Sequence, residues 1–142
     1  MKKIYIVLTL ILSTLVVTSC SESYDDYDTD RNDLIGFTFG VLELPLPPGQ
    51  SANIPVTYFV TSVSDVDRTF QVEVVAEETE LSSDNYSFDA NVVVPANERR
   101  GTIFVTLTNN SAPSEFAAVV FAFQNTASVS SGKTAVLKLK TP

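Results

Sequence analysis

The sequence predicts an all-β domain built from two packed antiparallel sheets, preceded by a cleavable leader and a flexible tether. Apolar and polar residues alternate with a period of two over several short segments, as they do in strands with one buried face. Clusters of Pro, Gly, Asn, Asp and Ser separate these segments, and no window has a helical apolar face. One apolar run, Ile4–Val17, stands apart at the N-terminus.

Residues 1–19 are expected to form a signal peptide that is removed. Two lysines precede the run Ile4–Val17, which is too short to span a membrane comfortably as a helix. The run leads into Val17-Thr18-Ser19-Cys20, which resembles the site recognised by the lipoprotein signal peptidase. The resemblance implies that Val17, Thr18 and Ser19 direct cleavage and that Cys20 receives a lipid.

Cys20 is the only cysteine of the chain, so no intramolecular disulfide can form. An ordinary secretory signal with a cysteine nearby is the alternative interpretation, and it leaves the position of this single thiol unexplained. Each buried methylene of a lipid adds about 0.8 kcal/mol of membrane affinity, so two or three acyl chains form a lasting anchor. We therefore expect a membrane-anchored lipoprotein.

Acidic and hydroxyl residues follow the cysteine, and residues 20–33 are expected to form a flexible tether. Its start is similar to the acidic export signal that sends Bacteroidetes-type lipoproteins to the outer face of the outer membrane. The residues of that signal would be Ser21, Glu22, Ser23, Asp25 and Asp26. A solvated spacer has the same composition, and both interpretations can hold together. The expected location is the outer membrane, facing the cell exterior.

The domain is expected to occupy residues 34–142 and to contain about seven strands, for which there are eight candidate segments. The candidate strands are residues 35–42, 52–63, 70–74, 86–88, 91–94, 102–107, 119–123 and 135–140. Turn residues lie at 45–49, 82–85, 97–101, 109–113 and 130–132. Pro55 cannot donate to a ladder, so we expect it at the start or the edge of a strand. Short strands separated by turns predict an immunoglobulin-like β-sandwich.

The middle of the domain resembles the Calx-beta family and related Bacteroidetes lipoprotein domains. The matching segments are residues 67–74, 83–86, 94–98, 101–105, 109–110 and 115–123. The resemblance implies a β-sandwich, and some members of the family bind calcium through clustered carboxylates at the strand tips. This chain has Asn109 and Asn110 where the family often has an acidic pair, and it retains Glu115.

Calcium requires six to eight oxygen ligands, with several carboxylates among them. Asp84 and Glu115 are the remaining calcium candidates, and Asp65 and Asp67 could lie near a tip of the sandwich. Solvated loop acids are the simpler interpretation of all four residues, so the sequence predicts no metal site and no cofactor.

Composition argues against several functions. Loss of the two leader lysines takes the formal net charge from −8 to −10, and the chain has no basic stripe for nucleic acid. There is no histidine, so histidine-based metal sites, general bases and catalytic triads are excluded. The chain holds only five glycines and no glycine-rich phosphate loop. We therefore expect a protein that is not an enzyme.

A non-catalytic binding module is the leading hypothesis, and its partner could be a polysaccharide, another envelope protein or a host molecule. Sugar sites combine an exposed aromatic ring with polar groups for the hydroxyls. The ligand-contact candidates are Tyr58, Phe59 and Phe104. Tyr58 and Phe59 point to opposite faces of one strand, so one of them must leave the core. The alternative is a structural or adhesion module that contacts other envelope proteins through open strand edges.

Overall fold

The structure, a computed structural model, describes residues 32–142, which fall within one compact unit. The leader, nearly all of the tether and the sites assigned to them lie outside the described residues and stay predictions. The sites concerned are Val17, Thr18, Ser19, Cys20, Ser21, Glu22, Ser23, Asp25 and Asp26. Among residues 32–142, no helix is long and apolar enough to cross a membrane.

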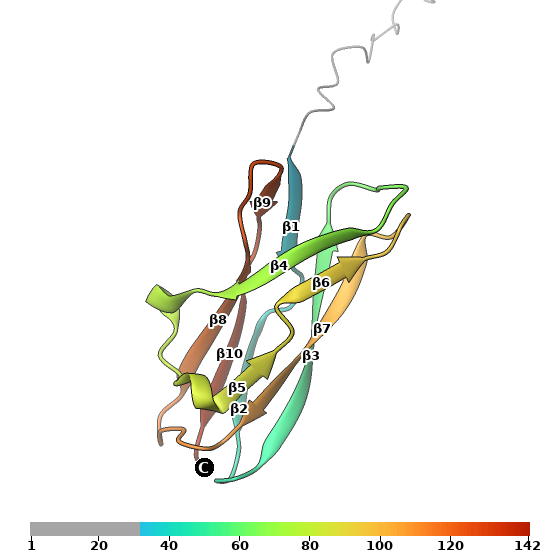
Figure 1. The fold of residues 1–142 in the computed structure, drawn as a ribbon. Coiled ribbons are helices and arrows are strands. Elements are labelled where there is room, and N and C mark those ends of the chain that lie inside the picture. The colour runs from blue at the N-terminus through green and yellow to red at the C-terminus, as the bar shows by residue number, and fades with distance from the viewer. Residues whose placement is uncertain (1–31) are drawn as a thin grey trace, which may run out of the picture. The chain divides into compact units, whose positions relative to one another are not determined.

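Residues 32–142 contain ten strands in two five-stranded sheets, which enclose the core between them (Figure 1). The first sheet has the order β5 (Tyr86–Phe88), β7 (Arg100–Thr108), β3 (Ser51–Val60), β1 (Asp33–Phe37) and β9 (Val129–Ser131). The second has the order β2 (Val41–Pro45), β10 (Ala135–Lys140), β8 (Ala117–Phe123), β4 (Arg68–Val74) and β6 (Asn91–Val94). Two single 3₁₀ turns, η2 (Ala76–Glu78) and η3 (Ser83–Asn85), join β4 to β5. The predicted all-β sandwich is confirmed.

The first predicted strand, 35–42, is wrong as a single element. It is divided into β1 and β2, and these belong to different sheets. β1 pairs antiparallel with β3, whereas β2 runs parallel to β10. The chain therefore crosses from one sheet to the other between Phe37 and Val41, so the N-terminal segment contributes one strand to each sheet.

The predicted turn at 130–132 is also wrong in part, because Val129–Ser131 form β9. This strand runs parallel to β1, with Asp33 opposite Val129 and Ile35 opposite Ser131. A short polar segment becomes a strand here because the edge of β1 offers backbone partners, and such partners are not visible in the local sequence. The division of 35–42 and the addition of β9 account for most of the difference between about seven strands and ten.

Pro55 is the fifth residue of β3, which lies between β7 and β1. The Thr38 N–H donates to the Thr57 carbonyl at 2.9 Å, so the odd-numbered residues of β3 turn their backbone groups toward β1. β1 ends at Phe37, opposite Tyr58, and no longer accompanies β3 at Pro55. Pro55 therefore lies inside an inner strand, and the expectation of a strand start or edge is wrong. Its missing N–H costs no ladder bond, because it points to the side from which β1 has already departed.

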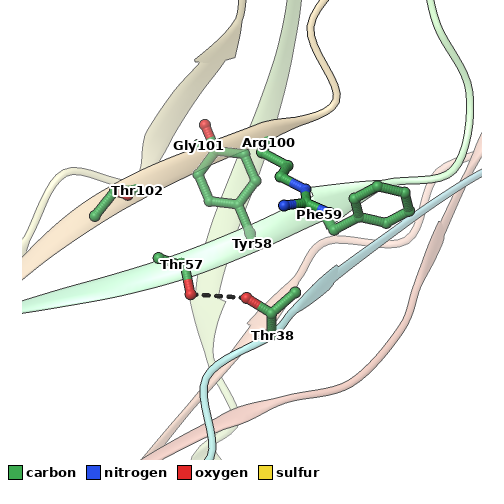
Figure 2. A pocket seen from close by; sticks show the side chains of 7 residues that line it. All are labelled: Thr38, Thr57, Tyr58, Phe59, Arg100, Gly101 and Thr102. Atoms are coloured by element: carbon green, nitrogen blue, oxygen red, sulfur yellow. Dashed lines mark hydrogen bonds between the residues drawn. The ribbon is translucent and has the colours of Figure 1, made fainter.

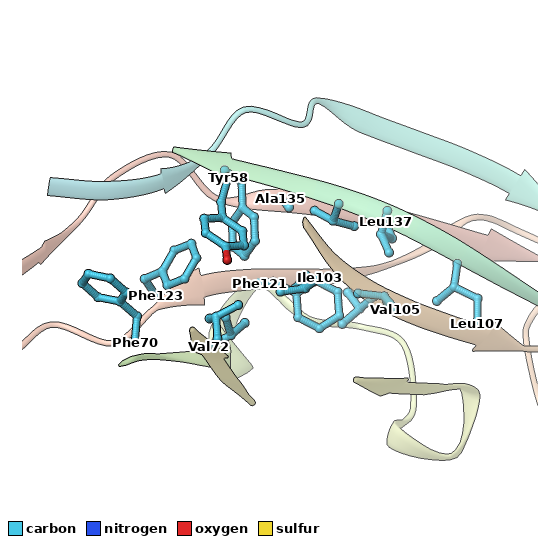
Figure 3. Close-up of a cluster of buried hydrophobic side chains, with 14 of the residues drawn as sticks. Tyr58, Phe70, Val72, Ile103, Val105, Leu107, Phe121, Phe123, Ala135 and Leu137 are labelled. Carbon is cyan, nitrogen blue, oxygen red and sulfur yellow. The ribbon is translucent and has the colours of Figure 1, made fainter. Parts of the chain in front are cut away.

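Aromatic side chains from both sheets meet in the core (Figure 3). Phe123 of β8 stacks on Phe37 at 4.7 Å between ring centroids and meets Tyr58 edge-on at 5.6 Å. Phe121, two residues earlier, makes edge contacts with Tyr86 and Phe88 of β5. β8 thus joins the sheets through rings whose edge-to-face geometry adds to the free energy of area burial.

β8 departs from the half-buried strand that alternation predicts. Val119, Phe121 and Phe123 face the core, but Val120 and Ala122 on the other face are also buried. The segment after β4 runs beside β8 and is hydrogen-bonded to its backbone. The Val75 N–H donates to the Val120 carbonyl at 2.9 Å, and the Val120 N–H donates to Thr79 Oγ1 at 3.0 Å.

A buried asparagine fixes the loop that follows β7. Asn109 is 2 % exposed, and its Nδ2 donates to the Leu46 carbonyl at 2.6 Å and to Thr141 Oγ1 at 3.0 Å. Its Oδ1 accepts a hydrogen bond from the Ala112 N–H at 3.1 Å. All three partners need a side chain that both donates and accepts, which an amide provides and an ionised carboxylate does not.

Candidate functional site

The outer face of β3 and β7 carries the side chains that leave the core. In an antiparallel pair, residues directly opposite each other share a face. The register therefore places three cross-strand pairs side by side on this face, Phe59 with Arg100, Thr57 with Thr102, and Pro55 with Phe104. In this row, the threonine pair lies between the Phe59–Arg100 pair and the apolar Pro55–Phe104 pair.

An open hollow of about 660 Å³ lies over the Phe59 end of this row (Figure 2). Its lining consists of Thr38, Thr57, Tyr58, Phe59, Arg100, Gly101 and Thr102. Sites for small ligands commonly measure roughly 300–1,000 Å³, so the hollow is large enough for one or two sugar-sized groups. It is open to solvent on one side, as a site for part of a longer polymer must be.

Three threonine hydroxyls lie on one side of the hollow. Thr38 Oγ1 and Thr57 Oγ1 are hydrogen-bonded to each other at 2.7 Å, and Thr102 lies across from Thr57 on β7. Each hydroxyl can donate one hydrogen bond and accept two. The group can therefore donate to a polar ligand and accept from it, while the short side chains leave the space above them open.

A flat ring and a cation form the other side. Phe59 is partly exposed, and the guanidinium carbon of Arg100 lies 5.8 Å from the centroid of its ring (Figure 2). This distance is within the range of a cation–π contact, which at an exposed site contributes about 0.5–1 kcal/mol. The contact holds the arginine beside the ring.

Tyr58 lies behind the hollow and belongs to the core. It is 3 % exposed and packs over Gly101, where a β-carbon would collide with its phenol oxygen. Burial raises the pKa of the Tyr58 phenol above its usual value of 10.0. Of the two neighbouring aromatic residues, Phe59 is therefore the one that leaves the core, and Tyr58 contributes to the hollow from beneath.

Phe104 is exposed by 58 % but does not line the hollow. It lies opposite Pro55, farther along the same face. The structure thus brings Tyr58 and Phe59 to one hollow and leaves Phe104 outside it. Arg100 and the three threonines were not among the candidates, because their proximity to Phe59 depends on the register of β3, β7 and β1.

A second, smaller hollow of about 180 Å³ adjoins the first and shares Thr38 and Phe59 with it. Its other lining residues are Leu34, Gly36, Phe37, Thr61, Gly132 and Lys133. The side chain of Phe59 is therefore a wall common to both hollows. Lys133, which follows β9, was likewise absent from the candidates drawn from sequence.

The calcium candidates serve other roles or stand apart. The Asp84 carboxylate accepts hydrogen bonds from Asn85 Nδ2 at 3.0 Å and from Ser111 Oγ at 2.8 Å. Asp67 Oδ1 accepts from the Ala96 N–H at 2.8 Å. In the part of the chain that the structure describes, no three or more acidic, cysteine or histidine residues are placed to hold a metal ion, and Glu115 joins no such group.

Comparison with known proteins relates the chain to others by fold. No protein-family model matches the sequence, and no curated protein sequence does. Among solved structures, a Bacteroides ovatus protein of unknown function covers 74% of the chain with a TM-score of 0.59 and 12% identity. A second Bacteroides ovatus protein, provisionally described as carbohydrate-binding, covers 76% with a TM-score of 0.60 and 12% identity. The chain spans 43% and 37% of the lengths of these two proteins.

The apo form of the Calx CBD1 domain is also similar. It covers 79% of the chain with a TM-score of 0.54 and 10% identity, and the chain spans 99% of that domain. The Calx-beta-like sandwich expected from the sequence is thereby confirmed as a fold. Identities this low establish shared architecture alone.

Proposed function

We propose that this chain is a non-catalytic lipoprotein of the outer membrane, displayed on the cell surface, and that the outer face of β3 and β7 binds glycans. The observation that carries the glycan assignment is the larger hollow, in which the ring of Phe59 faces open space beside the hydroxyls of Thr38, Thr57 and Thr102. The fold shared with a Bacteroides ovatus protein provisionally described as carbohydrate-binding supports the assignment.

The chemistry of sugars fits this combination. A pyranose ring has a face of C–H groups that packs on an aromatic ring, and its edge carries hydroxyls that need donors and acceptors. Phe59 offers the flat surface, and the threonine hydroxyls lie close to it on the same sheet face. The hollow is open, so a polysaccharide can cross it without a chain end entering.

Membrane attachment through the Cys20 lipid suits a module of this kind. The chain carries a formal net charge of −8, so an anionic membrane surface would repel it without a covalent anchor. A surface-displayed domain could then hold a polysaccharide near the cell. The acidic residues after Cys20 are assigned to the export signal.

A ligand-binding experiment tests the glycan assignment. The full chain in mild detergent is titrated with a panel of soluble polysaccharides, and Phe59→Leu is compared with the wild type. This substitution keeps an apolar side chain but removes the flat ring. We expect at least one polysaccharide to bind and Phe59→Leu to weaken it about threefold to tenfold. Phe104→Leu, on the same face outside the hollow, is the matched control and should bind as the wild type does.

Two results would overturn the assignment. One is that no polysaccharide of the panel binds the folded protein. The other is that Phe59→Leu and Phe104→Leu both bind with wild-type affinity. The variants must have the same melting temperature as the wild type, so that a loss of binding cannot be attributed to unfolding.

A separate experiment tests the anchor. Cells that express the wild type or Cys20→Ser are grown with labelled palmitate and then treated with protease while intact. The wild type should incorporate the label and be cleaved from the outside, and Cys20→Ser should do neither. An unlabelled wild type would refute lipidation, and cleavage only after permeabilisation would refute surface display.

An assembly module is the second candidate, and the edge of β7 favours it. β5 pairs only with Val105–Leu107, so the backbone groups of Thr102 and Phe104 on that side have no strand partner within residues 32–142. Phe104, 58 % exposed, stands beside this edge. An extended segment of another envelope protein could pair there. Loss of an envelope-protein contact in Phe104→Asp, with glycan binding intact, would identify this role.

A further inference from the structure

One basic side chain lines each of the two hollows, and no carboxylate lines either of them. This placement is unusual for a chain of formal net charge −8. The basic residues between positions 32 and 142 are Arg68, Arg99, Arg100, Lys133, Lys138 and Lys140. Arg68 pairs with Asp33 and Lys138 with Glu43, each at 3.0 Å. Arg100 lines the larger hollow and Lys133 the smaller one.

The sheet register places these two cations on opposite sides of Phe59. Phe59 of β3 lies opposite Arg100 of β7 and opposite Gly36 of β1, so all three positions share the outer face. A β-carbon at Gly36 would lie 2.7 Å from the Lys133 backbone nitrogen. The chain at Lys133 therefore lies over Gly36, on the side of Phe59 away from Arg100.

The position of Lys133 is fixed by the backbone. The Phe37 N–H donates to the Lys133 carbonyl at 2.8 Å, and the Gly132 N–H donates to the Ile35 carbonyl at 2.7 Å. Glycine at position 36 permits this close approach, which any side chain would block. These hydrogen bonds thus hold the backbone of Lys133 beside the smaller hollow. Its long side chain is free to reach a ligand there.

The charged groups of Arg100 and Lys133 form no salt bridge with any carboxylate of residues 32–142, where both ion pairs involve other residues. A guanidinium has five N–H donors and an ammonium three. Arg100 is oriented by the Phe59 ring, and the edge of its guanidinium remains available to an acceptor. Hydrogen bonds from such groups to a carboxylate are charge-assisted and roughly twice as strong as those between neutral groups.

We propose that the polysaccharide bound at this face is acidic and carries carboxylate groups, as a chain of uronic acid residues does. The proposal rests on the glycan function proposed above and names its ligand class. Phe59 packs against the C–H face of one sugar, and Arg100 and Lys133 contact carboxylates on either side of it. Because the rest of the domain is acidic, anions are held at this face and repelled elsewhere.

The test compares one polymer in two charge states. Polygalacturonic acid and its fully methyl-esterified form have the same backbone, and only the first carries carboxylates. Both are titrated into the full chain in mild detergent by calorimetry. We expect the acid to bind about tenfold or more tightly than the ester. Raising the NaCl concentration from about 0.05 to about 0.5 M should weaken binding of the acid, because salt screens exposed charges.

Three variants test the residues. Arg100→Gln and Lys133→Gln should each weaken binding of polygalacturonic acid about threefold to tenfold, because each removes one charge-assisted contact at a partly solvated site. Arg99→Gln is the matched control. It removes the same charge from the neighbouring residue, which lines neither hollow, and should change the affinity less than about twofold.

The outcomes separate this inference from the function on which it rests. If a neutral polysaccharide binds, is weakened by Phe59→Leu and is unaffected by Arg100→Gln and Lys133→Gln, the acidic ligand is refuted and the glycan function stands. Preference for a sulfated polymer over the carboxylated one also refutes the carboxylate assignment. If neither acidic nor neutral polysaccharides bind the folded chain, both proposals fail. If Arg99→Gln and Arg100→Gln weaken binding equally, the attraction is unspecific, and the assigned contact between Arg100 and a carboxylate is refuted.

Discussion

Replacement of Asn109 by aspartate should destabilise the fold, although an acid is the residue that the Calx-beta resemblance favours there. Asn109 Nδ2 donates to the Leu46 carbonyl at 2.6 Å and to Thr141 Oγ1 at 3.0 Å, and the side chain is 2 % exposed. An ionised aspartate cannot donate either bond, and it would place a charged oxygen against the Leu46 carbonyl.

The magnitude follows from these contacts. Two lost hydrogen bonds cost about 1 kcal/mol each, and the unsatisfied Leu46 carbonyl and the buried charge of the new carboxylate raise the total to about 3–5 kcal/mol. Domains of this size are stable by only about 5–15 kcal/mol, so the change removes a large part of the free energy of unfolding. The melting temperature of Asn109→Asp should fall by roughly 12–25 °C at neutral pH.

The deficit should also depend on pH. Burial raises the pKa of the new carboxyl in the folded state above the unfolded value of about 3.9. The cost is therefore complete above the folded pKa and shrinks as the pH falls toward 3.9, because a protonated carboxyl can donate one bond. Urea denaturation of Asn109→Asp and the wild type across this pH range measures the difference.

Asn53→Asp is the matched control, because Asn53 lies on the exposed face of β3. Its free energy of unfolding should change by less than about 0.5 kcal/mol. If Asn109→Asp unfolds within about 1 kcal/mol of the wild type at neutral pH, or if its deficit does not shrink on acidification, the assigned role of the amide is incorrect.

Three further predictions concern packing and charge. Gly101→Ala should destabilise the protein by about 1–3 kcal/mol in urea denaturation, because the added methyl collides with Tyr58, whereas Gly40→Ala meets nothing within 4 Å and should be neutral; equal effects of the two would contradict this. Burial raises the pKa of Tyr58 above 10.0, so its contribution is complete below pH 10 and is lost as the pH rises toward the folded pKa. Tyr58→Phe should therefore show a smaller alkaline decline in unfolding free energy than the wild type, and parallel declines would refute the assignment. Arg68→Ala should cost about 2–4 kcal/mol, because it leaves the partly buried Asp33 carboxylate, 3.0 Å away, without its cation; a double-mutant cycle with Asp33→Ala that finds no coupling would argue against it.

Several elements of the fold could be predicted because their signal is local. Ile103, Val105 and Leu107 are buried, while Thr102 and Phe104, which alternate with them, are exposed, as the pattern indicates. Backbone geometry alone decides to which face of a strand a side chain points, so the buried face can be predicted before the partner strand is known. The sandwich class follows from the number of such segments and the turns between them.

Other elements depended on partners distant in sequence. β9 carries no strand signal of its own, and it forms because β1 presents a free edge beside Val129–Ser131. Val120 and Ala122 lie on the face of β8 that alternation predicts to be exposed and are nevertheless buried. Local patterns cannot report which distant parts of the chain pack around a strand.

The candidate site divides in the same way. The sequence alone determined that Tyr58 and Phe59 point to opposite faces and that Phe104 lies out of phase with a buried strand, because side-chain direction is a local property of extended backbone. Only the tertiary structure decided that Phe59, Arg100, Thr57 and Thr102 form one face, since that requires the register of β3 against β7. Lys133 joins them through the close approach at Gly36. Register and approach are set by packing of the whole core, so no local stretch of sequence encodes them.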